Sequence, residues 1–143
     1  MKSNQSWRSD SPDSSVHKWA SDAFADLAMV LADNLRHYEN RWLGVPIWQL
    51  PADLMFLQDV LFEYRPKTII ETGTKFGGSA VFFSSIQMLL GLDARVISID
   101  IEKNPQLERT LGYGRRLGLY FEFVEANAVD PKTWKNIFQH SRE

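Results

Sequence analysis

The chain has 143 residues and a net charge of −2, with 44% hydrophobic and 24% charged residues. This length is enough for one domain with a substantial core, and the small net charge gives no overall attraction to nucleic acid or to an anionic membrane. The absence of cysteine excludes disulfides, thiolate metal sites and cysteine nucleophiles.

The N-terminal part of the chain predicts a tail followed by helices. Residues 1–15 are rich in Ser, Asp and Asn and lack the apolar segment of a secretory signal, so we expect a disordered tail. Residues 16–66 predict an N-terminal helical segment, in which apolar residues at helical spacing indicate helices over 17–40 and 52–64. Because no apolar run approaches the roughly 18 residues of a membrane span, we expect a cytoplasmic protein, with association with a membrane surface left open.

A loop over residues 41–51 separates the two helices and is broken by one glycine and two prolines. Trp42 and Trp48 flank the middle of this loop. We expect both rings to pack the long N-terminal helix onto the rest of the fold, in preference to forming a platform for a substrate.

Residues 67–143 alternate short apolar strands with helices. The expected strands are 68–72, 95–99 and 120–125, and the expected helices are 77–90, 105–117 and 131–140. Strands that alternate with helices pair in parallel through crossover helices. We therefore expect an α/β fold of the Rossmann-like type, with three parallel strands and flanking helices.

The strongest functional signal is a glycine-rich turn directly after the first expected strand. Glu71, at the end of that strand, can bind an ammonium or a hydroxyl group, and Gly73 stands where a side chain would block a ligand. The glycines at the start of the next helix free its N-terminus, which favours a negatively charged group. The alternative is a tight turn without a ligand, which a buried acid followed by three glycines disfavours.

Two further polar residues follow the next strands. Asp100 ends the second strand at a spacing where a carboxylate bridges ribose hydroxyls, although capping a turn is the alternative. Asn127 follows the third strand and is placed to contact an adenine edge. The expected cofactor-binding residues are Glu71, Gly73, Thr74, Gly77, Gly78, Ser79, Asp100 and Asn127.

The spacing between Glu71 and the glycines that follow it favours some classes of cofactor over others. The turn lacks the Gly-Lys-Ser/Thr of a phosphate-binding loop and the Gly-x-Gly-x-x-Gly of a dinucleotide site. Its acid-x-Gly-x-x-x-Gly pattern fits better with a cofactor that has an amino acid moiety and a ribose but no pyrophosphate. S-adenosylmethionine (SAM) has this composition, and a nicotinamide-binding oxidoreductase half-domain is the weaker alternative.

Several short motifs occur in order along residues 40–131. They are Arg41-Trp-Leu-Gly44, Pro51-Ala-Asp53-Leu54, Arg65-Pro66, Ile70-Glu71-Thr-Gly-Thr74, Gly77-Gly-Ser79 and Ile99-Asp-Ile101. This series resembles the cephalosporin hydroxylase family, which contains SAM-dependent methyltransferases, among them rhamnosyl O-methyltransferases that modify bacterial glycolipids. The resemblance implies a class I methyltransferase fold, O-methylation of a hydroxyl on a sugar, glycolipid or small natural product, and often a divalent metal such as Mg.

The chain departs from the family pattern in two places. Gln49 occupies a position where the family often has Lys. The family also continues past a fourth strand to acids and a His that carry the metal and the catalytic base, and nothing after Glu143 supplies them. The resemblance therefore implies a sheet whose C-terminal part is missing, metal ligands beyond this chain, and no assignable catalytic residue within it.

Two functions follow as expectations: a SAM-dependent O-methyltransferase, or a truncated remnant that binds the cofactor without catalysis. We expect a small-molecule or glycan acceptor and not nucleic acid, because 16 Lys and Arg are outnumbered by 18 acids and form no basic stripe. A sheet cut off after its third strand exposes an edge and apolar helix faces, which predicts a homo-oligomer.

Overall fold

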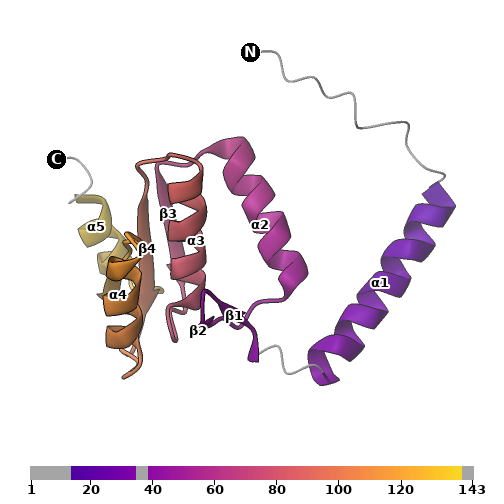
Figure 1. Cartoon of the computed structure of the whole chain (residues 1–143), viewed down its shortest axis with the longest axis horizontal. Helices are drawn as coiled ribbons and strands as arrows, with labels where there is room; N and C mark the ends of the chain where they lie inside the picture. Colours follow the sequence, from indigo (N-terminus) through magenta and orange to yellow (C-terminus); the bar gives the residue numbers. More distant parts are fainter. Residues whose placement is uncertain (1–13, 35–38, 140–143) are drawn as a thin grey trace, which may run out of the picture. The chain divides into compact units, whose positions relative to one another are not determined.

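The computed structural model describes residues 14–34 and 39–139 of the chain (Figure 1). The chain divides into two compact units, residues 1–36 and 37–143. In the first unit the described element is the helix α1 (Ser14–Asn34).

The bounds of α1 differ from the expected ones at both ends. Ser14 and Ser15, which were expected in the tail, already belong to the helix, and residues 1–13 lie outside the described part. At the other end the expected helix reached residue 40, but Glu39 and Asn40 are not α-helical. Residues 35–38 between them also lie outside the described part.

The second unit contains a hairpin, a three-stranded sheet and four helices in its described part. Its elements are β1 (Arg41–Trp42), β2 (Val45–Pro46), α2 (Pro51–Tyr64), β3 (Thr68–Thr72), α3 (Gly78–Leu89), β4 (Arg95–Asp100), α4 (Leu107–Arg116), β5 (Glu122–Glu125) and α5 (Pro131–Gln139). β4 lies between β3 and β5 and pairs with both in parallel. The expected α/β fold with three parallel strands is confirmed.

β5 and α4 each begin two residues later than expected, for a local reason, and α3 begins one residue later, at Gly78. β5 begins at Glu122 instead of residue 120, because the Tyr120 carbonyl accepts a hydrogen bond from Ser84 Oγ of α3 at 2.8 Å instead of joining the sheet. α4 begins at Leu107 instead of residue 105. Asn104 holds a turn before it, where its Oδ1 accepts from the Gln106 amide at 2.9 Å.

The hairpin β1–β2 lies in a segment that was expected to be a loop. Arg41 pairs with Pro46 and Trp42 with Val45 in antiparallel register. The two residues between the strands, Leu43 and Gly44, have φ angles of 48° and 84°. Positive φ at both central positions is the type I′ turn that matches the twist of a hairpin.

The two faces of the sheet carry separate cores, because neighbouring residues of a strand point to opposite faces. On one face Val96 packs in a cluster with Phe82, Phe83 and Ile86 of α3. On the other face Ile97 and Ile99 pack with Ile137 and Trp134 of α5. Figure 1 shows the sheet between α3 and α5.

The sequence predicts one apolar stripe along helix α3, but the structure buries a larger part of the helix surface. Its residues 80–87 are all buried. The hairpin covers one side, where the Trp42 indole donates to Ser85 Oγ at 2.9 Å and meets the Phe82 ring edge-on at 5.0 Å. α2 contributes buried Leu61, whereas Tyr64, which was expected on the same buried face of α2, is exposed. No helix in the described ranges is long and apolar enough to cross a membrane.

Candidate functional site

The candidate site lies where the parallel strands end, since parallel strands bring their carboxyl ends to one edge of the sheet. Thr72 at the end of β3 pairs with Ile99, and Asp100 at the end of β4 pairs with Glu125 of β5. The ends of β3 and β4, the loops after β3 and β5, and the first turn of α3 hold the eight residues expected to bind a cofactor.

Glu71 anchors a chain of hydroxyl groups under the glycine turn. Ser98 Oγ on β4 lies 2.6 Å from Glu71 Oε1 and 2.7 Å from Thr74 Oγ1. Thr74 and Ser98 are both buried. Burial raises the pKa of the Glu71 carboxyl, against the opposing effect of hydrogen bonds from the Ser79 and Ser98 side chains. Glu71, Thr74 and Ser79 are thus brought together, and Ser98 joins them.

The chain turns sharply at Gly73, directly after β3. The Gly73 amide donates to the Ile99 carbonyl at 2.8 Å, and the Gly77 amide donates to the Thr74 carbonyl at 2.7 Å. Gly73 has a φ of 87°, and a Cβ added there would meet nothing within 4 Å. Open space on the ligand side of this residue agrees with the expected role, which stays a prediction.

Close packing within the protein also favours glycine at Gly77 and Gly78. A Cβ on Gly77 would lie 3.0 Å from Leu107 and 3.1 Å from Thr110, both on α4. A Cβ on Gly78 would lie 2.1 Å from the Pro46 carbonyl oxygen of the hairpin. These two glycines therefore bring the start of α3 against α4 and β2, and whether they also contact a ligand stays a prediction.

Asp100 links the end of β4 to the glycine turn. Its Oδ2 accepts a hydrogen bond from the Lys75 amide at 3.0 Å, and its Oδ1 accepts one from the Ile101 amide at 2.8 Å. Each carboxylate oxygen has two lone pairs. Asp100 therefore holds the turn in place and retains acceptor capacity for two hydroxyl groups.

Asn127 lies at the start of the loop after β5 and is exposed. Its Oδ1 accepts from the Val129 amide at 3.0 Å, and its carbonyl accepts from the Thr133 hydroxyl at 2.8 Å. The side-chain amide group, with its two donors, is the part of Asn127 that remains for a ligand.

A small pocket of about 50 Å³ opens beside the turn. Trp48, half exposed, lies at this pocket, with its ring 5.6 Å from the Phe76 ring and the Lys75 ammonium 4.9 Å from its centre. Trp48 is therefore a rim residue. Trp42 packs into the core against α3, and the expected role of both rings in packing the N-terminal helix stays a prediction. Lys75 and Phe76 were missed as site residues, although both lie inside the glycine motif.

The described residues do not fit a metal ion. No group of three or more His, Cys, Asp or Glu within 14–34 and 39–139 is arranged to hold one. We therefore derive no chemistry through a metal.

A parallel sheet with a glycine turn and an acid at its carboxyl edge defines a protein of the Rossmann-like fold. The family model described as rhamnosyl O-methyltransferase/CmcI matches residues 34–143. This chain belongs to the rhamnosyl O-methyltransferase/CmcI family.

Two curated relatives are rhamnosyl O-methyltransferases of mycobacteria. That of Mycobacterium leprae is 38% identical over 60 residues, which cover 42% of this chain and 26% of the relative. That of Mycobacterium bovis is 31% identical over 98 residues, which cover 68% of this chain and 38% of the relative. The chain thus spans less than two fifths of the length of these relatives.

Solved structures show the same fold. A CmcI apo structure matches 71% of this chain and 41% of its own chain with a TM-score of 0.59 and 24% identity. A CmcI structure with Mg-SAM matches 70% of this chain and 41% of its own with a TM-score of 0.57 and 24% identity. A putative caffeoyl-CoA O-methyltransferase from Staphylococcus aureus matches 84% of this chain and 54% of its own, with a TM-score of 0.51 and 23% identity.

Proposed function

We propose that this chain binds SAM at the carboxyl ends of β3 and β4 and functions as a SAM-dependent O-methyltransferase. The observation that carries the proposal is the position of Asp100, whose carboxylate adjoins the Gly73 turn through its hydrogen bond with the Lys75 amide. A carboxylate beside a glycine turn suits a cofactor with a ribose. Membership of the family and the fold shared with CmcI solved with Mg-SAM support the same cofactor.

In this proposal three side chains divide the binding of the cofactor. Asp100 accepts hydrogen bonds from the ribose hydroxyls, and Asn127 meets the adenine edge with its amide group. Glu71 lies at the bottom of the turn, where its carboxylate faces the ammonium of the methionine moiety. Burial raises the pKa of the Glu71 carboxyl. A bound cation acts in the opposite direction, because it stabilises the ionised carboxylate, and the carboxylate in turn attracts the cation.

Bound SAM supplies an electrophilic methyl group on its sulfonium. The contribution of this chain is to hold that group in line with an incoming hydroxyl oxygen, and such positioning supplies a large part of a methyl-transfer rate. Trp48 and Lys75 lie at the rim of the pocket on this side of the turn.

We propose a hydroxyl on a sugar, glycolipid or small natural product as the acceptor. The names of the two mycobacterial relatives support a sugar. The exposed ring of Trp48 offers a flat apolar surface beside the pocket, and aromatic rings of this kind combine apolar area with a polar edge. The small net charge of −2 offers no general attraction to nucleic acid.

Transfer of tritiated methyl groups from SAM to a panel of rhamnosides, phenols, RNA and protein tests the reaction and its acceptor. We expect label on the rhamnosides or phenols. Label on RNA or protein alone would contradict the acceptor class. SAM binding without label on any acceptor would instead support the alternative, a cofactor-binding protein without catalysis.

The variant Trp48→Ala tests the rim of the pocket in the same assay, or in a full-length relative. We expect the acceptor KM to rise by about tenfold, because burying the apolar surface of such a side chain contributes roughly 1.5–3 kcal/mol, while SAM affinity stays unchanged. Tyr120→Ala is the matched control, since this ring is also exposed but follows α4, before β5 begins. A lowered melting temperature with an unchanged KM would assign Trp48 a purely structural role.

A further inference from the structure

A second concave surface lies on the other side of the hairpin from the candidate cofactor site. It is a groove of about 410 Å³ between the β1–β2 hairpin and α4. This volume lies within the range of small-molecule sites, and it is far larger than the pocket of about 50 Å³ at the glycine turn. Pro46 of β2 lines both the groove and the small pocket, so β2 lies between the two sites.

One face of α4 forms a wall of this groove. The residues involved are spaced at i, i+3, i+4 and i+7, and they are Gln106, Arg109, Thr110 and Tyr113. Residues at these spacings share one side of a helix. Thr110 holds this wall to the rest of the fold, because its hydroxyl donates to the Phe76 carbonyl at 2.8 Å.

The groove is positively charged. Arg41 of the hairpin and Arg109 of α4 both line it, and its nine lining residues, all described, include no acid. Arg41 uses one N–H for a long hydrogen bond of 3.4 Å to the Gly44 carbonyl, and a guanidinium has five. Arg116 adds a third charge nearby, with its guanidinium 5.7 Å from the centre of the Tyr113 ring.

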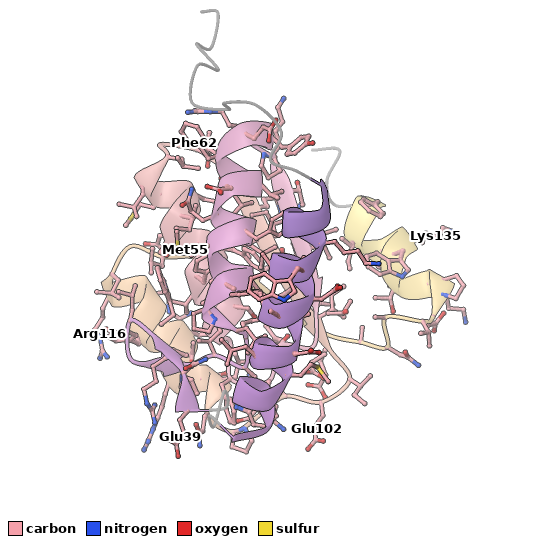
Figure 2. All side chains as sticks on the ribbon, turned by 90° about the vertical axis from the view of Figure 1, so that its right-hand side faces the viewer. Glu39, Met55, Phe62, Glu102, Arg116 and Lys135 are labelled. Carbon is pink, nitrogen blue, oxygen red and sulfur yellow. The ribbon has the colours of Figure 1, made fainter. Side chains whose placement is uncertain are left out.

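Two acids close in sequence to the arginines do not line the groove. Glu108 lies on another side of α4, where it forms an ion pair with Lys103. Glu39 precedes the hairpin and does not line the groove (Figure 2 labels Glu39 and Arg116). The remaining lining from the hairpin, including Val45 and Pro46, is apolar or backbone.

We propose that this groove binds a small molecule of about the size of a sugar that carries a phosphate or a carboxylate. Arg41 and Arg109 approach the oxyanion from the two walls, and a guanidinium can bind a phosphate or carboxylate through two parallel N–H bonds. Gln106 and the Tyr113 hydroxyl provide neutral polar contacts, and the apolar hairpin residues pack against the ring. This site does not depend on SAM, so it stands or falls separately from the proposed function.

Calorimetry on the full chain in the absence of SAM tests the groove, with glucose 1-phosphate, glucuronate, inorganic phosphate and glucose as probes. We expect the two anionic sugars to bind and glucose not to bind. Preference for glucose 1-phosphate and phosphate identifies a phosphate site, and preference for glucuronate identifies a carboxylate site. The three anions are added at concentrations about ten times higher than a millimolar dissociation constant. If none of them gives heat of binding, the proposal is overturned.

Variants then locate the binding. Arg109→Gln and Arg41→Gln should each raise the dissociation constant about tenfold or more, the effect of losing a charged hydrogen bond. Arg115→Gln is the matched control, since Arg115 is an exposed arginine of the same helix that does not line the groove. Equal weakening by Arg115→Gln would show that only the general charge of α4 attracts the anion, and would contradict a built site.

Discussion

Glu71 places a carboxylate in a largely buried position, where its ionised form is disfavoured. Burial raises the pKa of this carboxyl, so the native state keeps the proton to higher pH than the unfolded chain does. The free energy of unfolding should therefore fall as the pH rises from the ordinary Glu pKa of about 4.3 through the raised value.

The variant Glu71→Gln removes this titration and keeps an oxygen that accepts the Ser98 hydrogen bond. We expect its free energy of unfolding to stay level over the same pH window, so that its advantage over the natural chain grows towards neutral pH. Urea unfolding at a series of pH values measures this. Glu125→Gln, a change at an exposed carboxyl at the end of β5, should leave the slope as it is. Identical slopes for Glu71→Gln and the natural chain would refute the assignment.

Single residues also show which features of the site the sequence could predict. The acid at the end of β3, the glycine turn and Asp100 were predicted from their order, because they follow strand ends that parallel pairing brings together. Ser98 was not predicted, since a serine inside a strand gives no sign of facing Glu71 until the strand register is known. Trp48 was expected to pack the long N-terminal helix onto the rest of the fold, and only the structure shows its ring half exposed at the pocket.

At the scale of elements, the first residues of α3 connect the site to the hairpin. Gly78 lies so close to Pro46 that an added Cβ would fall 2.1 Å from the carbonyl oxygen. We expect Gly78→Ala to force the hairpin away from α3 and to destabilise the chain by about 1–3 kcal/mol, the usual cost of overpacking.

Thermal unfolding followed by circular dichroism measures this effect. Gly112→Ala on α4 is the matched control, because a Cβ there meets nothing within 4 Å, and alanine should stabilise the helix by about 0.5–1 kcal/mol. A Gly78→Ala variant with the melting temperature of the natural chain would show that the hairpin does not need this contact.

The elements of the parallel sheet were predictable and the hairpin was not, for a physical reason. β3 and β4 have five and six residues with isoleucine and valine at their centres, which predicts strands, whereas β1 and β2 have two residues each, too few to show any periodicity. The expected helix over 17–40 also extended too far, since Glu39 and Asn40 are not α-helical and local patterns alone do not mark where a helix stops.

At the scale of the whole molecule, α2 carries an exposed apolar surface. Met55, Phe56, Phe62 and Tyr64 are all exposed on it, and Figure 2 labels Met55 and Phe62. Exposed apolar residues in such numbers on one helix mark an interaction surface, so we predict a homo-oligomer.

Light scattering at several protein concentrations measures the association. Phe56→Lys should shift the chain towards a monomer, whereas Val129→Lys, at an exposed apolar residue after β5, should not. A natural chain that is monomeric at all concentrations would contradict the prediction.

The most direct test of the central claim is calorimetry of the chain with SAM and, separately, with NAD. We predict that SAM binds and NAD does not, and that Asp100→Ala weakens SAM binding by about 1.5–3 kcal/mol, the range for a hydrogen bond to a charged group. Asp93→Ala, at an exposed carboxyl before β4, should leave the affinity unchanged. Binding of NAD alone, or an Asp100→Ala variant with full affinity for SAM, would contradict the account.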